Sequence, residues 1–415
     1  MRRMIHTVIF LGLVLAAPAW GLNGSVSAVH TEGFSEGQLY DSGLILRFDH
    51  SLSLGNTELR GDGRLRWNTS GCAATAAGED CDVDPLQFDW RELYLSRNIG
   101  DWQLSAGLQQ VVWGRADSLR VVDVPNPLDL RDFLLPDFNE SRMSSAMIRG
   151  TGPVGQWNLE ALWLPYFKPT RLAAEGTPYD LRIDRDFRDS GLETQAAARP
   201  PRNGSRGELA LRAATTRGPL DIDIVVFNGY NDDAVYVLEP TGFDAVGIRP
   251  VYRRHSLVGA SAAYAFESGW VLRSEAAWSP DMPYSNLIDA ETIRAATFLA
   301  LIGLDYQWRD WLFSAQINDR KILSLRPEMG TPEHAAIVTF SATGNTHQGK
   351  MLHRIAWTVM PQYGDGNWLQ WRTSWQFDDH WQVEGNFDLL NGRDSGFLGQ
   401  FSARDRLRME LRYQF

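Results

Sequence analysis

Beyond its first residues, the sequence lacks any hydrophobic run near the roughly 20 apolar residues that a membrane-spanning helix needs. The opening stretch, MRRMIHTVIFLGLVLAAPAWG, has a charged head at Arg2 and Arg3 followed by a short apolar run. These features are typical of a secretory signal peptide. We therefore expect residues 1–21 to be removed by cleavage near Ala19 or Gly21. The mature chain, 22–415, is then exported as one domain without a transmembrane helix.

Cysteine and clustered basic residues are also scarce. The formal net charge of −11 argues against a nucleic-acid partner, because phosphates require grouped Lys and Arg. The only two cysteines, Cys72 and Cys81, are nine positions apart. In an exported protein this spacing favours a disulfide over a metal site, since no histidine lies nearby. The sequence also has no CxxCH haem motif and no cluster of metal ligands, so we expect no cofactor and no metal.

A helical period of useful length is absent, whereas alternation with a period of two recurs along the chain. The final residues, RDRLRMELRYQF, place Leu407, Met409 and Leu411 on one face of a strand, and charged residues on the other. The stretches WVLRSEAAW, LDIDIVV and WQVEGNFDLL alternate in the same way. The pattern predicts an all-β chain.

Short turns and long connections follow one another along the sequence. The short links are 55–56, 99–101, 152–155, 217–219, 268–269, 309–310, 364–366 and 391–394. The long connections are 70–84, 113–141, 165–205, 230–249, 280–294 and 322–349. This order predicts an up-and-down barrel of about eighteen strands, with both termini on the short-turn side. Sixteen strands is the alternative, because the strands at 24–32 and 395–402 are the weakest.

The placement of tryptophan favours a membrane over a soluble core. Tryptophan begins the strand after five of the short turns, at Trp102, Trp157, Trp270, Trp311 and Trp368. Amphipathic rings of this kind form girdles at the level of the lipid headgroups. Trp368 has the opposite parity to its strand, so it either points into the lumen or lies in the turn. The expected fold is therefore a transmembrane antiparallel β-barrel in contact with outer-membrane lipid and lipopolysaccharide.

The terminal strand predicts a further partner. Outer-membrane barrels characteristically end in an amphipathic strand whose last residue is aromatic, and the barrel assembly machinery recognises that strand. The ending MELRYQF, with Phe415 last, resembles this signal closely. We therefore expect the outer membrane of a Gram-negative cell as the location.

Parity also predicts which charged residues face the lumen. The inward set is Arg273, Glu275, Arg320, Arg372, Arg406, Arg408, Glu410 and Arg412. Mixed charges of this kind can simply solvate the inner wall and pair across strands. The arginines of the last strand are the best candidates for more, because they present a basic strip in an acidic protein.

The segment 113–141 is dense in Asp, Arg, Pro and Asn, and its charges nearly balance. Balanced charge suits a segment folded back into a barrel, because burying unpaired charge is costly. We predict that it forms a constriction or partial plug, although an ordinary extracellular loop is the alternative. The residues expected to take part are Trp113, Arg115, Asp117, Arg120, Asp123, Asn126, Asp129 and Arg131.

The stretch 90–132 resembles a family of proteobacterial outer-membrane barrels described as a domain of unknown function. The resemblance lies in Arg91-Glu92, Gly107-Leu108-Gln109, Trp113-Gly114, Asp123 and Asn126-Pro127-Leu128-Asp129. It is clear over the first third of the chain and continues only as a barrel pattern. It implies an outer-membrane location and the handling of lipophilic compounds such as hydrocarbons, sterols or fatty acids.

Three classes of function are compatible with these features. The first is a channel for small molecules, with a slight preference for hydrophobic compounds because loop 165–205 mixes aromatic residues with arginines. A general or anion-preferring porin is the alternative. The second is a scaffold that binds a periplasmic or surface partner, and a periplasmic or inner-membrane transport partner also fits a channel. The third, an enzyme, is disfavoured because no histidine lies in a nucleophile motif, and His255-Ser256 point to opposite faces of a strand.

Overall fold

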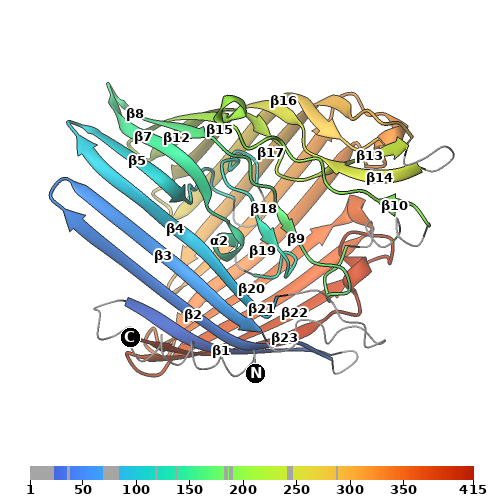
Figure 1. Cartoon of the computed structure of the whole chain (residues 1–415). Helices are drawn as coiled ribbons and strands as arrows, with labels where there is room; N and C mark the ends of the chain where they lie inside the picture. The colour runs from blue at the N-terminus through green and yellow to red at the C-terminus, as the bar shows by residue number, and fades with distance from the viewer. Residues whose placement is uncertain are drawn as a thin grey trace.

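The computed structural model describes residues 23–34, 38–68, 84–116, 120–136, 138–181, 186, 190–240, 246–286 and 288–415. Its main feature is one antiparallel sheet of eighteen strands that closes on itself (Figure 1). The strands are β1 (Asn23–Gly33), β2 (Leu39–Leu54), β3 (Thr57–Asn68), β4 (Leu86–Ile99), β5 (Trp102–Gln109), β7 (Ser145–Val154), β8 (Trp157–Leu164), β11 (Glu208–Arg217), β12 (Leu220–Tyr230), β15 (Arg254–Ala265), β16 (Trp270–Tyr284), β17 (Ile293–Trp308), β18 (Trp311–Ile322), β19 (His334–Thr346), β20 (Met351–Met360), β21 (Gly366–Gln376), β22 (Trp381–Asn391) and β23 (Arg406–Gln414). The all-β barrel and the strand number are confirmed.

The barrel closes where the last strand pairs with the first. Strand β23 runs antiparallel to β1 from Ser25–Gln414 to Gly33–Arg406. Phe415 and Gly24 complete the seam by exchanging two backbone hydrogen bonds of 3.0 and 3.1 Å. A Cβ on Gly24 would lie 2.9 Å from the Phe415 ring, so this glycine makes room for the terminal aromatic side chain. Closure removes the open sheet edges that would otherwise be left unpaired.

Alternation divides the wall into an apolar outer face and a polar inner face. On β23, Leu407, Met409 and Leu411 are 37%, 51% and 41% exposed, whereas Arg406 and Glu410 are buried. The other strands repeat this division, with outward side chains such as Leu211, Ile302 and Trp371 more than half exposed. A continuous apolar outer surface requires lipid around it, so the barrel spans a membrane through its strands. No helix in the described part of the chain is long and apolar enough to cross a membrane.

Eight short turns join the strands at one rim, which we call the short-turn rim. Trp102, Trp157, Trp270 and Trp311 begin strands directly after these turns, as expected. Trp102 and Trp311 each cover a glycine of the neighbouring strand, Gly152 and Gly344, where a Cβ would collide with the indole. Both ends of the barrel lie at this rim, which confirms the predicted placement of the termini.

Two details of the strand count are wrong, and they cancel. Residues 322–349 are not one long connection, because they contain β19. Residues 395–402 are not a strand, because they form a loop with the 3₁₀ helix η5 (Gly399–Phe401). The links at 364–366 and 391–394 therefore lie at the opposite rim, the long-loop rim. Trp368 accordingly belongs to no girdle: it is 9% exposed and its Nε1 donates to Asp388 inside the barrel at 3.0 Å.

The long-loop rim carries small elements of its own. Strands β10 (Glu193–Thr194), β13 (Val235–Pro240) and β14 (Val246–Val251) form a three-stranded sheet there. Strands β6 (Asp129–Leu130) and β9 (Arg171–Leu172) pair in parallel, which joins the segment after β5 to the segment after β8. The short helices are α2 (Phe138–Ser141), η2 (Gly204–Arg206), η3 (Pro327–Met329) and η4 (Pro361–Tyr363).

Candidate functional site

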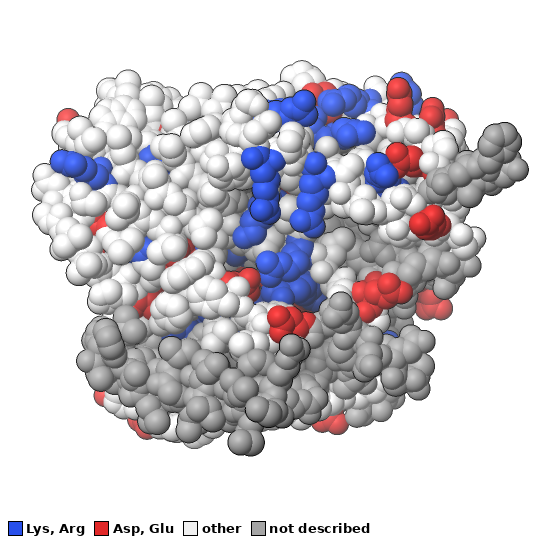
Figure 2. Space-filling model, in the orientation of Figure 1, with Lys and Arg blue, Asp and Glu red and all other residues white. Residues whose placement is uncertain are grey.

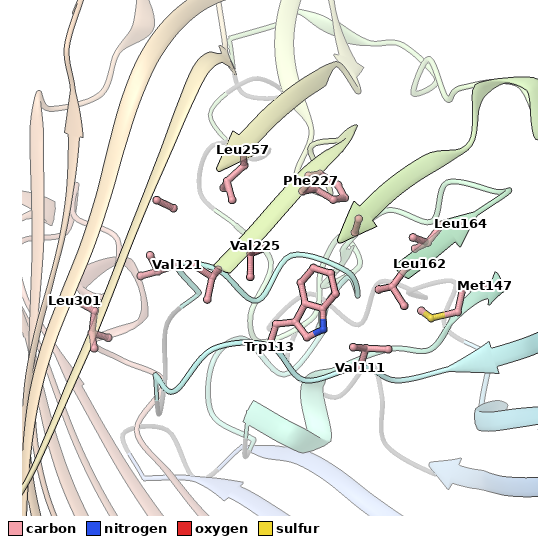
Figure 3. Packing of buried hydrophobic residues seen from close by; sticks show 13 residues of the cluster. Val111, Trp113, Val121, Met147, Leu162, Leu164, Val225, Phe227, Leu257 and Leu301 are labelled. Carbon is pink, nitrogen blue, oxygen red and sulfur yellow. The ribbon is translucent and has the colours of Figure 1, made fainter. Parts of the chain in front are cut away.

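The segment between β5 and β7 folds into the lumen, as predicted, and Trp113 is its main anchor. Trp113 is 1% exposed and packs with Val111 and Val121 against inward residues of β7, β8, β12, β15 and β17 (Figure 3). Its indole Nε1 donates to Glu160 Oε2 on β8 at 3.0 Å. Burying an aromatic side chain of this size stabilises the docked position by about 3–5 kcal/mol relative to alanine. The segment is therefore attached to the wall by a hydrophobic core of its own.

Asn126 joins the two ends of the segment through hydrogen bonds of its side chain. Its Oδ1 accepts the Val111 N–H at 2.7 Å, and its Nδ2 donates to the carbonyls of Gln109 and Met143 at 2.9 Å each. Asn126 is 1% exposed, so these three bonds replace water that cannot reach the site. Pro127 follows directly, and its lack of a backbone N–H leaves no unsatisfied donor there.

Carboxylates fix the backbone of the inserted tip. Asp123 accepts the Trp113 N–H at 3.0 Å and also pairs with Arg142. Glu275, on β16 across the lumen, accepts the backbone N–H of Arg115. Gly114 has a φ of +87°, and a Cβ there would lie 3.0 Å from Glu275 Oε1, so glycine is required by both conformation and space.

The arginines of the segment pair with acids of the wall and the outer loops. Arg115 Nη2 lies 2.8 Å from Asp223 on β12, and Arg120 Nη1 lies 3.4 Å from Asp232. Arg131 Nη2 lies 2.6 Å from Asp129 within β6 and the turn that follows it. Although burial opposes ionisation of Asp129, its hydrogen bond and charge contact with Arg131 outweigh this effect, so the pKa of the carboxyl is well below its usual range. The near balance of charge noted in the sequence therefore reflects paired charges.

Helix α2 presents Glu140 to three arginines of the opposite wall. The carboxylate lies 2.7 Å from Arg47 on β2, 3.4 Å from Arg64 on β3 and 3.7 Å from Arg91 on β4. Burial alone would raise the pKa of Glu140, but Arg47, Arg91 and Arg64 hold it well below the usual range. Glu140 is therefore ionised at neutral pH.

A β-bulge brings Arg91 into this group. The register between β3 and β4 shifts between Asp62 and Gly63, which pair with Glu92 and Trp90, so Arg91 is the extra residue. Because of this shift, two consecutive residues of β4 face lumen partners: Arg91 lies near Glu140, and Glu92 lies 3.6 Å from Arg60. Bulges commonly re-aim a side chain near a functional site.

Two cavities lie on either side of the inserted segment. The outer cavity, of about 350 Å³, lies toward the long-loop rim between β1–β3, β21–β23 and the segment. Its arginines are Arg47, Arg64, Arg66, Arg131, Arg372, Arg406, Arg408 and Arg412. Its carboxylates are Asp41, Asp129, Asp132, Glu140, Glu384 and Glu410. Eight arginines and six carboxylates line the cavity, and two carboxylates just outside the lining, Asp89 and Asp388, pair with Arg64, Arg131 and Arg406.

The inner cavity, of about 660 Å³, lies toward the short-turn rim. It is lined by residues near that rim, such as Leu312 and Thr343, and by Arg273 with its partner Asp305. Glu140 borders both cavities, so α2 stands between them. Basic side chains also gather near the middle of the face shown in Figure 2, around the position that β9 has in Figure 1.

The structure places the predicted lumen residues in two groups and leaves one apart. Arg372, Arg406, Arg408, Glu410 and Arg412 line the outer cavity, and Arg273 and Glu275 line the inner one. Arg320 lies elsewhere, where it donates to Thr331 and to the carbonyl of Pro332 in the β18–β19 connection. Cys72, Cys81 and Asp117 lie outside the described residues, as does the signal segment.

The arginines of the last strand are largely paired. Arg406 lies 2.8 Å from Asp388, and both side chains are almost fully buried. Glu410 lies between Arg408 and Arg412, at 3.1 and 2.7 Å. Since these pairs also hold the side chains in fixed positions, the basic strip forms an ordered part of the wall.

Arg47, Arg64 and Glu140 were not among the site residues predicted from the sequence. Arg64 has the same parity as Arg60, Asp62 and Arg66 in RGDGRLRW, so alternation could have indicated its face. Glu140 lies in a loop segment, 93 positions from Arg47. No sequence pattern indicates that pairing.

Aromatic residues of loop 165–205 serve mainly in packing. Phe167 contacts the rings of Tyr230 and Tyr252, with centroids 5.3 and 4.9 Å away. Tyr179 is 3% exposed and packs against Phe133 and Phe401. Tyr179 and the aliphatic Leu172 of the same loop also line the outer cavity.

Solved structures with the same architecture come from outer-membrane proteins. OccAB3 of Acinetobacter baumannii is 8% identical, with a TM-score of 0.54 over 95% of this chain and 98% of that one. OpdK of Pseudomonas aeruginosa, solved with vanillate, is 10% identical, with a TM-score of 0.52 over 95% and 98%. OccK3 (OpdO) of Pseudomonas aeruginosa is 10% identical, with a TM-score of 0.51 over 95% of each chain. At this identity the likeness concerns the fold, which is that of an outer-membrane barrel.

Sequence comparison gives the family. Among curated proteins, none matches this chain. A family model matches residues 38–367, which include the inserted segment and every motif residue that anchors it. The chain therefore belongs to the family described as protein of unknown function DUF1302.

Proposed function

We propose that the protein is an outer-membrane channel that passes small organic anions through its lumen. The observation that carries the proposal is the group of eight arginines that lines the outer cavity, at the long-loop side of the inserted segment. Fixed positive charge in a narrow, partly desolvated passage attracts anions and repels cations. Glu140 of α2 borders both cavities, so we expect selection to take place beside this helix.

The outer cavity also favours solutes that have an apolar part. Leu44, Ile45, Leu135, Leu172 and Tyr179 share its wall with the arginines. This mixture suits an aromatic or short aliphatic carboxylate, and it retains part of the expected preference for fatty-acid-like compounds. Neutral hydrocarbons and sterols gain less support, because each would displace water from charged groups without replacing their hydrogen bonds. The OpdK structure with vanillate shows that a barrel of this fold can hold an aromatic carboxylate.

Ion selectivity in a planar bilayer tests the proposal. The refolded mature barrel is placed between unequal KCl concentrations, and the reversal potential is measured. We expect current steps and a reversal potential with the sign of chloride preference. A cation preference, or the absence of current together with no uptake of benzoate into liposomes that contain the barrel, would contradict the proposal.

A further inference from the structure

Three arginines of neighbouring strands point at one spot in the lumen. Arg47 and Arg64 are directly opposite each other in the β2–β3 register, and the bulge adds Arg91 from β4. Like charges directly opposite each other in a sheet are unfavourable unless an anion lies between them. The wall therefore contains a preformed site for a negative group.

In this structure Glu140 fills that site. Arg47 holds its carboxylate in bidentate fashion, with Nη1 2.8 Å from Oε1 and Nη2 2.7 Å from Oε2. This parallel pair matches the spacing of two carboxylate oxygens. The Glu140 side chain is 33% exposed and borders both cavities, and Arg47 and Arg64 line the outer one, so a dissolved carboxylate can approach these arginines from the outer cavity.

Helix α2 does not depend on this carboxylate alone. Arg91 Nη2 donates to the carbonyl of Asn139 at 3.2 Å, and Arg142 pairs with Asp123 next to Trp113. The Glu140 side chain can therefore rotate away while the segment stays docked. The Nε atoms of Arg47 and Arg64 are buried and have no hydrogen-bond partner among the described atoms, so Glu140 does not satisfy every donor of the two guanidinium groups.

We propose that Arg47, Arg64 and Arg91 form the carboxylate-binding site of the transport path, and that Glu140 is its built-in competitor. The proposal rests on the channel function above and deepens it. A solute carboxylate displaces Glu140, binds Arg47 in the same bidentate way and then passes α2 from one cavity to the other. A competitor that occupies the site about nine-tenths of the time weakens the apparent affinity about tenfold. It also excludes neutral solutes, because only an anion can replace its charge.

Calorimetric titration of the detergent-solubilised barrel tests this inference without requiring ion flow. The probes are benzoate and benzamide, which differ in charge and hardly in shape. Glu140→Gln should bind benzoate about tenfold more tightly than the wild type. The double variant, with both Glu140→Gln and Arg47→Gln, should bind benzoate at least about tenfold more weakly than Glu140→Gln alone. Benzamide should bind none of the variants measurably.

Asp49→Asn is the matched control. Asp49 lies on β2, two positions from Arg47, and pairs with Arg60 outside both cavities. Asp49→Asn removes the same amount of charge as Glu140→Gln but at a position outside the site. The benzoate affinity of this variant should therefore stay within about twofold of the wild type. Equal affinities in the wild type and Glu140→Gln, or an equal gain in Asp49→Asn, would overturn the inference.

The same variants separate this inference from the channel proposal. If the barrel passes anion-selective current but Glu140→Gln binds benzoate no more tightly than the wild type, Glu140 is not a competitor, while the channel function is upheld. The expected pattern of affinities in a barrel that passes no ions would uphold the binding site and overturn transport.

Discussion

Replacing Asn126 by alanine is expected to loosen the inserted segment while the barrel remains intact. The change removes three buried hydrogen bonds, to Val111, Gln109 and Met143, and the backbone groups they satisfy have no access to water. At about 1 kcal/mol for each bond, the docked state loses about 3 kcal/mol, or a factor of roughly 150 in its equilibrium.

Hydrogen exchange measured by mass spectrometry can follow this loss, because local opening sets the exchange rate of protected amides. Peptides that contain Val111 and Trp113 should exchange roughly a hundredfold faster in Asn126→Ala, whereas peptides from β19 should not change. Asn56→Ala, in the exposed β2–β3 turn, serves as the control. The reasoning fails if the segment exchanges at the wild-type rate, or if the strands speed up equally, since the loss would then be global.

Three further predictions concern the seam, the buried pairs and acid. Deletion of Phe415 removes both backbone hydrogen bonds to Gly24 and the proposed recognition signal for the assembly machinery. Outer-membrane fractions should therefore contain much less heat-modifiable barrel. An undiminished amount of assembled barrel would contradict this. Asp388→Asn leaves buried Arg406 without the negative charge that lies 2.8 Å away and should destabilise the barrel by about 3–5 kcal/mol in urea titrations, whereas Asp49→Asn should cost less than about 1 kcal/mol. Because the pKa values of Asp129 and Glu140 are depressed on docking, their contribution is complete above the ordinary carboxyl pKa values and is lost only as pH falls below them. Exchange protection of 110–144 should therefore be constant from about pH 7 to 5 and decline below about pH 4, and a decline already between pH 7 and 6 would refute these pairings.

The alternation of apolar and polar residues predicted the barrel because the two faces of each strand differ in polarity, one facing lipid and the other facing water. On β23 every second residue from Arg406 to Arg412 is charged, so the period of two is clear. Strand β19 was missed because HAAIVTFSATGNT has small or uncharged residues on both faces, so the contrast is weak. The stretch 395–402 was one of the two weakest predicted strands, and its Leu398 and Phe401 instead lie in the loop with η5 and pack inward against Phe133 and its neighbours.

The inserted segment was predictable from its charge balance, but its partners were not. Parity assigns a residue to the lumen without showing what stands across from it. Arg47 and Glu140 meet only because the segment turns back over strands β2 to β4. The motif residues Gln109, Trp113, Asp123 and Asn126 were identified from a resemblance, and their hydrogen bonds give the physical reason for their spacing.

In our proposal, the segment 113–141 narrows an anion-conducting lumen. This can be tested by single-channel conductance of the intact barrel, beside a variant in which a short glycine-serine linker replaces the segment. We predict small anion-selective steps from the intact barrel and steps several-fold larger, with weaker selectivity, from the variant. Equal conductance and equal selectivity in the two proteins would contradict the account.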